Sequence, residues 1–215
     1  MKRAAPYRID AGPACQLPRR RALSCGVVLL GLGLGLLPCT DSLADAGVPL
    51  SLQVLLLSHL GSYDRNFKAR AGAVANILVV QRRGNSDSAF EQASLVKALS
   101  ELHDIGGVPI HVDQADFTDP DTLAKRCRTD KIAVLYLTVG VEADMPRLAA
   151  DLVNRDILTV GTTARHAENG AVVGFALEEA RPRLVINLPQ AKAQNVDFRA
   201  DVLQLATLIT TPPHR

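Results

Sequence analysis

The sequence predicts a single α/β domain, Rossmann-like in winding, with a mainly parallel sheet flanked by helices and with an antiparallel hairpin and a final helix at the C-terminus. Two observations predict this class. Apolar runs with the composition of strands covered on both faces alternate with amphipathic segments of helical period. Such alternation builds right-handed βαβ units, in which the strands lie parallel. Near the end, two runs with alternating apolar residues follow one another directly, which is typical of a hairpin.

The first helix of this domain is expected to begin at Pro49 and to end at Gly61. Its inward face should carry Leu52, Leu56 and Leu60, because residues four apart lie on one side of a helix.

The nearly all-apolar run over residues 73–80 follows and predicts a strand covered on both faces. Ser88 with Glu91 three residues later forms a capping box and predicts the start of the next helix. Gly106 and Gly107 predict its end.

The middle of the chain contributes three more predicted strands, over residues 108–112, 132–137 and 157–160. Asp119 and Pro120, a cap and a first-turn proline, predict the helix after the first of them. Pro146 predicts the start of the helix before the last of them. Leu148, Leu152 and Val153 should point inward from that helix.

The hairpin is predicted from Val173 and Phe175 on one arm and Leu184 and Ile186 on the other. Pro182 cannot donate to a ladder, so the segment that contains it is expected to turn the chain.

The final helix is predicted from one apolar stripe. Phe198, Val202, Leu205 and Ile209 recur at helical spacing, and Asp197 precedes them as a cap.

The first 44 residues are typical of an export signal. Basic residues precede an apolar run over residues 22–37, which is shorter than the ~20 residues that span a bilayer. Small residues at Ala44 and Ala46 suit a signal peptidase. We therefore expect a cleaved signal peptide over residues 1–44, a domain over residues 45–215 and secretion to the periplasm. A lipoprotein site at Cys39 and a twin-arginine export route remain open as alternatives.

Cleavage changes the charge and the cysteine count of the protein. The leader holds six of the 24 Lys and Arg residues and two of the 22 Asp and Glu residues, so the mature net charge is about −2. This balance favours no nucleic-acid partner. The mature chain keeps only Cys127, which excludes an intramolecular disulfide. Its spacing from Leu123 predicts a buried structural thiol.

Several short motifs occur together in the second half of the chain: a Leu-Thr-Val-Gly strand ending at Gly161, then Gly170, a strand containing Phe175, and an Ile-Asn-Leu run around Asn187. With the earlier segments 62–67 and 75–80 and a leucine-rich stretch over residues 203–206, they resemble the YfiR family of small bacterial periplasmic proteins. The resemblance covers about residues 52–209. These motifs describe packing and turns, so they support the fold more than a detailed function.

The resemblance implies a regulator that binds the periplasmic region of an inner-membrane diguanylate cyclase and represses it, which lowers cyclic-di-GMP and biofilm formation. A membrane sensor kinase is an alternative partner, and a homodimer is compatible with the sequence. A solute-binding or ligand-sensing module is a different functional class. Because no nucleophile, metal-ligand set or paired carboxylates stand out, we expect no enzyme, no cofactor and no metal.

Ligands of open α/β sheets bind where the parallel strands end, so this rim is the first candidate site. Its predicted members are Arg82, Arg83, Asn85, Ser86, Asp113, Asp116, Thr138, Gly140, Thr162 and Thr163. Backbone amides at a helix start beside the two arginines would suit an anion. An ordinary solvated loop is the favoured alternative.

The second candidate comprises Asp64, Arg65 and Asn66, three polar residues between the first helix and the first strand. A capping or turn role is the main interpretation. A partner interface is the functional alternative, because Arg is enriched at interfaces.

Overall fold

The computed structural model describes residues 47–211. The expected signal peptide, its cleavage sites and the alternative lipoprotein site lie outside these residues. The strands span Ala75–Arg82 (β1), Asp104–Ile105 (β2), Val108–Phe117 (β3), Ile132–Leu137 (β4), Leu158–Gly161 (β5), Val173–Glu178 (β6), Arg181–Asn187 (β7) and Ala206–Ile209 (β8). The helices span Leu50–Tyr63 (α1), Phe67–Ala71 (α2), Ser86–Ser100 (α3), Pro120–Thr129 (α4), Met145–Asp151 (α5), Ala164–Glu168 (α6), Leu188–Ala193 (α7) and Ala200–Leu203 (α8), with a 3-10 turn at Glu142–Asp144 (η1).

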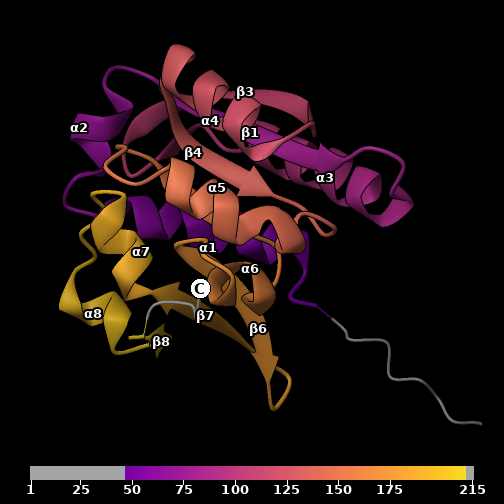
Figure 1. Ribbon diagram of the computed structural model, residues 1–215. Helices are drawn as coiled ribbons and strands as arrows, with labels where there is room; N and C mark the ends of the chain where they lie inside the picture. Colours follow the sequence, from indigo (N-terminus) through magenta and orange to yellow (C-terminus); the bar gives the residue numbers. More distant parts are fainter. Residues whose placement is uncertain (1–46, 212–215) are drawn as a thin grey trace, which may run out of the picture. The chain divides into compact units, whose positions relative to one another are not determined.

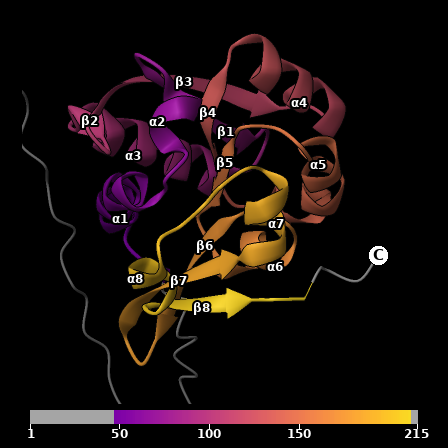
Figure 2. The same ribbon diagram turned by 90° about the vertical axis from the view of Figure 1, so that its left-hand side faces the viewer.

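The strands of the described residues form one sheet in the order β2-β3-β1-β4-β5-β6-β7-β8 (Figure 1 and Figure 2). The five strands β3, β1, β4, β5 and β6 run parallel, whereas β2 is antiparallel to β3 and β7 to β6. The terminal strand β8 runs parallel to β7 (Figure 2). The predicted α/β class, the mainly parallel sheet and the antiparallel hairpin are therefore confirmed.

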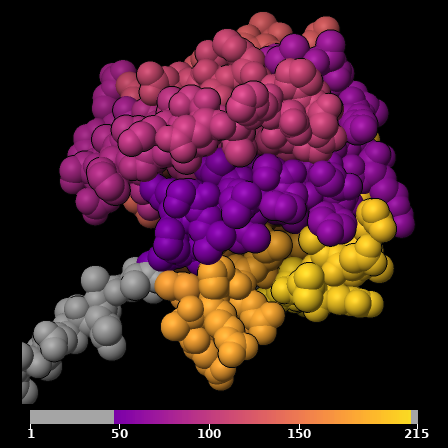
Figure 3. All heavy atoms as spheres, turned by 180° about the vertical axis from the view of Figure 1, so that it is seen from behind, coloured from indigo at the N-terminus to yellow at the C-terminus, as the bar shows by residue number. Residues whose placement is uncertain are grey.

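Helices cover both faces of the sheet because successive strand residues point to opposite sides. In β1, Ile77 and Val79 join the apolar cluster beneath α1 and α3. Leu78 and Val80 join a second cluster beneath α4 and α5. Figure 3 shows α1 between the α3 region on one side and the β6–β7 hairpin on the other.

The central elements follow their predictions closely. Strand β4 occupies the predicted residues, and all six of them are buried. Helix α4 begins at Pro120, where Asp119 accepts a hydrogen bond of 2.9 Å from the Thr122 amide. Leu123 and Cys127 share its buried face, as predicted.

Helix α1 does not end at Gly61, as predicted, but continues to Tyr63. A Cβ atom at Gly61 would lie 2.3 Å from Ile105 Cγ2, so this glycine allows a close approach instead of a helix end. The predicted inward face is also displaced. Leu60 is buried, but Leu52 and Leu56 are only half-buried, because α1 turns the face with Gln53, Val54 and Leu57 to the sheet.

The predicted capping box of Ser88 and Glu91 is wrong. The cap lies three residues earlier, at Asn85, whose side chain accepts from the amides of Asp87 and Ser88, so that α3 begins at Ser86. It also ends earlier, at Ser100. Gly106 and Gly107, with φ of 60° and 80°, instead form the turn between β2 and β3. A cap and a glycine pair are local signals that fit several neighbouring positions.

Three other boundaries differ from the prediction. Strand β3 runs to Phe117 instead of ending at residue 112, which places Asp113 and Asp116 within the strand. Val153 lies beyond α5 and is 43% exposed, so it does not point inward. The hairpin turns within the predicted segment over residues 179–182, at Glu179 and Ala180, both at positive φ, but Pro182 already belongs to β7 and pairs with Leu177.

The predicted final helix over residues 198–209 is wrong. Phe198 and Val202 are buried, but α8 ends at Leu203 and the chain continues as β8, which pairs with β7. Leu205 is 67% exposed, so the apolar stripe is broken. The β-branched residues in this segment suit a strand, and the open edge of the hairpin offers backbone partners that the stripe does not reveal.

No helix of the described residues is long and apolar enough to cross a membrane.

Candidate functional site

The first predicted rim arginine is held by its neighbours. Arg82 Nε donates to the Gly140 carbonyl at 2.8 Å, and its Nη2 pairs with Asp144. Its guanidinium also lies over the Phe117 ring, 4.4 Å from the ring centre. Through these contacts Arg82 joins the ends of β1, β3 and β4. Because Asp144 neutralises its guanidinium and Phe117 covers one face of that group, Arg82 has little capacity left to bind a ligand.

Arg83 is more accessible but is also paired. Its Nη2 lies 2.7 Å from Asp116 Oδ2 and its side chain is 80% exposed. A hydrogen bond from Gln81, followed by those from Arg83, lowers the pKa of Asp116. An exposed pair of this kind is worth about 0–1 kcal/mol, so Arg83 exchanges partners readily.

The helix start beside these arginines is already satisfied. Asn85 Oδ1 accepts from the amides of Asp87 and Ser88, both at 3.0 Å. Ser86 begins α3 without a side-chain role of its own in this cap. Since the cap takes two of the free amides, the predicted anion site at this position lacks its main donors.

A hollow of about 850 Å³ lies at the other half of the same rim, between the start of α1, helix α3 and the ends of β4 and β5. Thr162 and Thr163, both predicted rim residues, line it together with Glu91 and Phe90. Phe90 is 71% exposed. The structure thus brings the threonines together with residues of α3, but places the arginines outside the hollow.

Glu91 binds the ends of β4 and β5 to α3. Its Oε2 accepts from the Val139 amide and from Thr162 Oγ1, each at 2.9 Å. Burial raises the pKa of Glu91, and these two hydrogen bonds oppose the increase. The spacing of Glu91 from Ser88 predicted a capping role, so its contacts at the rim were not expected from the sequence.

Gln53 was also missed, although a glutamine within an apolar helix is a usable signal. It is buried, and its Nε2 donates to the carbonyls of Val48 at 2.8 Å and Thr162 at 3.0 Å. Its Oε1 accepts from Tyr136 Oη at 2.8 Å. This chain of bonds fixes the start of α1 over the rim.

His166 supports the rim from below. It is fully buried, with Nδ1 2.9 Å from Thr163 Oγ1 and Nε2 3.1 Å from the Thr138 carbonyl. Burial lowers its pKa, while the nearby Glu142 carboxylate opposes the decrease. Gly161 makes this position available, since a Cβ there would lie 2.0 Å from His166 Cβ.

The second candidate segment lies near the opposite edge of the sheet. Asp64 is buried, and its Oδ2 lies 2.6 Å from Arg70 Nη1. Its Oδ1 accepts from the amides of Asn66 at 3.0 Å and Asp197 at 3.1 Å. Asp64 is therefore a structural group and is not available to a partner, in agreement with the main interpretation of this segment.

Arg65 and Asn66 lie above this buried pair. Arg65 Nη1 is 3.1 Å from Asp197 Oδ2, and the two side chains are 63% and 50% exposed. Asn66 Nδ2 donates to the Asn195 carbonyl at 3.1 Å. We call Arg65, Asn66 and Asp197 the junction patch. It presents both signs of charge on a well-supported surface.

The motif residues have packing roles. Phe175 is buried, and Asn187 accepts from the Gln190 amide as the cap of α7 while donating to the Ala167 carbonyl at 2.8 Å. Gly170 has φ of 118° and faces Ala149. Among the described residues, no three His, Cys, Asp or Glu side chains gather closely enough to hold a metal ion.

Comparisons with known proteins agree with this architecture. A family model described as YfiR/HmsC-like matches residues 52–207. No curated protein matches the chain.

Three solved structures show the same fold at low identity. A ligand-free, open substrate-binding protein from Clostridium difficile has a TM-score of 0.53 and 14% identity, with 68% of this chain and 58% of that chain covered. A conserved domain protein from Vibrio cholerae has a TM-score of 0.56 and 14% identity, with 74% of this chain and 60% of that chain covered. An ABC domain in complex with L-Trp from Streptococcus pneumonia has a TM-score of 0.55 and 12% identity, with 75% of this chain and 62% of that chain covered. The aligned part thus spans about three-fifths of each of these solved chains.

Proposed function

Because the chain belongs to the YfiR/HmsC-like family, we propose that it is a periplasmic regulatory protein that represses an inner-membrane diguanylate cyclase by binding its periplasmic region. Repression would lower cyclic-di-GMP and biofilm formation. A membrane sensor kinase is the alternative partner within the same proposal, and a homodimer is compatible with it.

The junction patch is the observation that supports a protein-contact mechanism. Arg65 and Asp197 are exposed, while the backbone beneath them is fixed by the buried pair of Asp64 and Arg70. The Arg65 amide donates to the Asp197 carbonyl at 2.9 Å, so the two residues are also joined through the main chain. A fixed surface loses little conformational entropy on binding, and exposed charges of both signs orient a partner.

Gene deletion tests the regulatory proposal directly. Loss of the protein should raise cellular cyclic-di-GMP, and re-expression of the full chain should restore the original level. A copy without residues 1–44 should fail to do so, because a cytoplasmic protein cannot reach a periplasmic region. An unchanged cyclic-di-GMP level in cells that express the cyclase would contradict the cyclase proposal and favour a sensor kinase.

Two arginine variants test which surface contacts the partner. Arg65→Ala should weaken capture of the membrane partner by about 1–3 kcal/mol. Arg83→Ala is the matched control, since it removes an exposed, paired arginine from the rim. Thermal unfolding should stay nearly unchanged in both variants. Equal losses of capture, or a loss only in Arg83→Ala, would argue against the junction patch.

The hollow beside Phe90 supports a second candidate, a ligand-sensing or solute-binding module. Its volume of about 850 Å³ falls within the range of about 300–1,000 Å³ typical of small-molecule sites. A small molecule that binds there should lose affinity in Phe90→Ala and not in Arg65→Ala. Binding without any effect of gene deletion on cyclic-di-GMP would favour this candidate over the regulator.

A further inference from the structure

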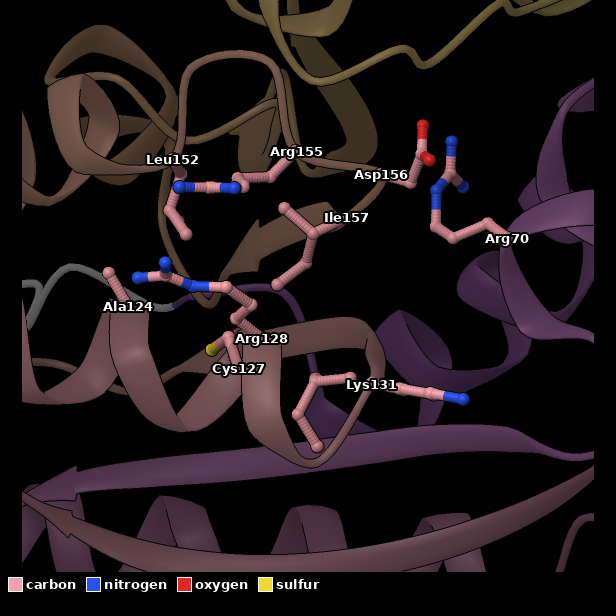
Figure 4. A pocket seen from close by; sticks show the side chains of 10 residues that line it. Arg70, Ala124, Cys127, Arg128, Lys131, Leu152, Arg155, Asp156 and Ile157 are labelled. Carbon is pink, nitrogen blue, oxygen red and sulfur yellow. The ribbon is translucent and has the colours of Figure 1, made fainter.

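A second cavity, of about 290 Å³, lies at the amino edge of the parallel strands, between the end of α4 and the segment that leads into β5 (Figure 4). Its polar lining is mainly cationic: Arg70, Arg128, Lys131 and Arg155, with Asp156 as the single carboxylate among the lining residues. Residues Leu152 and Ile157 contribute apolar wall. The cavity is separate from the hollow at the rim and from the junction patch.

Three of these cations have no anionic partner among the described residues. Arg128, Lys131 and Arg155 form no ion pair there, whereas the neighbouring Arg126 and Lys125 on α4 pair with Asp130 at 3.2 Å and Asp121 at 2.6 Å. Arg128 lies in the last turn of α4, where a basic residue also favours the helix dipole. The helix dipole does not explain the placement of Lys131 and Arg155, because both residues lie outside α4.

Arg70 gives a second, independent observation. Its side chain is only 1% exposed, with Nη1 bound to Asp64 and Nη2 donating to the Asn195 carbonyl at 2.9 Å. Its Nε is buried and has no hydrogen-bond partner in the part of the chain that the structure describes. A buried donor without an acceptor is costly, and Figure 4 shows the Arg70 guanidinium at the end of the cavity where Asp156 lies, so an acceptor placed at that end would offset the cost.

The charges define the ligand. Asp64 neutralises Arg70, and Asp156 is the single carboxylate among the lining residues, so the three remaining cations exceed it by two positive charges. Guanidinium groups bind phosphate in a bidentate manner, and the apolar wall suits a small organic body. We propose that this cavity binds a small phosphomonoester dianion. The proposal does not depend on the regulatory function.

Titration of the protein without residues 1–44 with inorganic phosphate tests the site, because inorganic phosphate carries the same charged group as a phosphomonoester. Binding should shift the ¹⁵N resonance of Arg70 Nε, and affinity measured by calorimetry should fall roughly tenfold or more in Arg128→Gln/Arg155→Gln. Arg126→Gln is the matched control, since it removes a cation from the same helix outside the cavity and should change the affinity less than roughly twofold.

Two results would overturn the proposal. The first is an equal loss in Arg126→Gln, which would indicate only general charge attraction. The second is the absence of any shift with phosphate together with binding to phosphatidylglycerol vesicles that the double variant abolishes, which would assign the cations to a lipid surface. If a phosphomonoester such as glycerol phosphate competes with inorganic phosphate for the cavity, that result would support a small phosphomonoester as the ligand and not a lipid headgroup.

Discussion

The carboxyl and amino edges of the parallel sheet use arginine in opposite ways. At the carboxyl edge, Arg82 and Arg83 pair with Asp144 and Asp116 and tie neighbouring strands together. At the amino edge, Arg128 and Arg155 face a cavity without a described partner. The residue type is the same, so the carboxylates that the topology places nearby determine whether an arginine is structural or available.

The two edges also differ in how they bury polar groups. The amino edge buries the ion pair of Asp64 and Arg70. The carboxyl edge holds two hydrogen-bonded groups that titrate, the buried His166 and the half-buried Glu91. Burial lowers the pKa of His166 and raises that of Glu91. The amino edge should therefore be sensitive to loss of a charge, and the carboxyl edge to changes in packing and pH.

The largest effect is expected from Asp64→Asn at the amino edge. The change leaves Arg70 as a buried charge without its counter-ion, so the free energy of unfolding should fall by about 3–5 kcal/mol. Denaturant unfolding measures this, with Arg65→Ala as a surface control that should cost less than about 1 kcal/mol. A loss of similar size in both variants would mean that the buried pair has no special role.

A smaller decrease in the free energy of unfolding is expected for Gly161→Ala at the carboxyl edge. The new Cβ would collide with His166, and overpacking of this kind costs about 1–3 kcal/mol. Gly47→Ala is the control, because nothing lies within 4 Å of a Cβ at that position. Unfolding of Gly161→Ala at the wild-type denaturant concentration would show that the rim adapts more easily than its packing indicates.

The pH dependence should distinguish the edges further. The folded state lowers the pKa of His166 below its ordinary value of 6.5, so the neutral ring contributes stability above pH 6.5 that is lost as the pH falls through the depressed pKa. Glu91 has the opposite effect. Its pKa in the folded protein is raised above the ordinary 4.5, so its contribution to the stability of the protein is present below pH 4.5 and is lost as the pH rises through the raised pKa.

Unfolding of wild type and His166→Gln between pH 7.5 and about 5 separates these contributions. The difference in stability between the two proteins should shrink as the pH falls below 6.5. A constant difference would show that His166 keeps its ordinary pKa in the folded protein.

The smallest effect is expected at Cys127 beside the cationic cavity. Burial raises the pKa of this thiol to about 12, so the native protein should react with a thiol reagent roughly a hundredfold or more slowly than the unfolded chain. Cys127→Ser should cost about 1 kcal/mol. Rapid labelling of native protein would mean that the amino edge opens readily.

Much of the fold was readable from local sequence patterns. The all-apolar run of β4 and the Asp119–Pro120 start of α4 are strong signals that depend on few distant residues. The structural interpretation of Asp64 also agreed with the fold, because a polar residue between a helix and a strand commonly caps or turns. Thr162 and Thr163 follow the end of β5, as predicted, and they line a hollow that the sequence did not predict.

Other features depended on contacts between distant residues. Gln53 meets Tyr136, 83 positions later, and Asp64 meets the Asp197 amide, 133 positions later. The segment over residues 206–209 has a helical stripe in sequence but becomes a strand because β7 offers it an open edge. The sequence by itself determined which segments are apolar and therefore the α/β class. The tertiary structure decided which polar groups meet, because hydrogen bonds and ion pairs need partners within a few ångströms, and the winding of the chain alone supplies them.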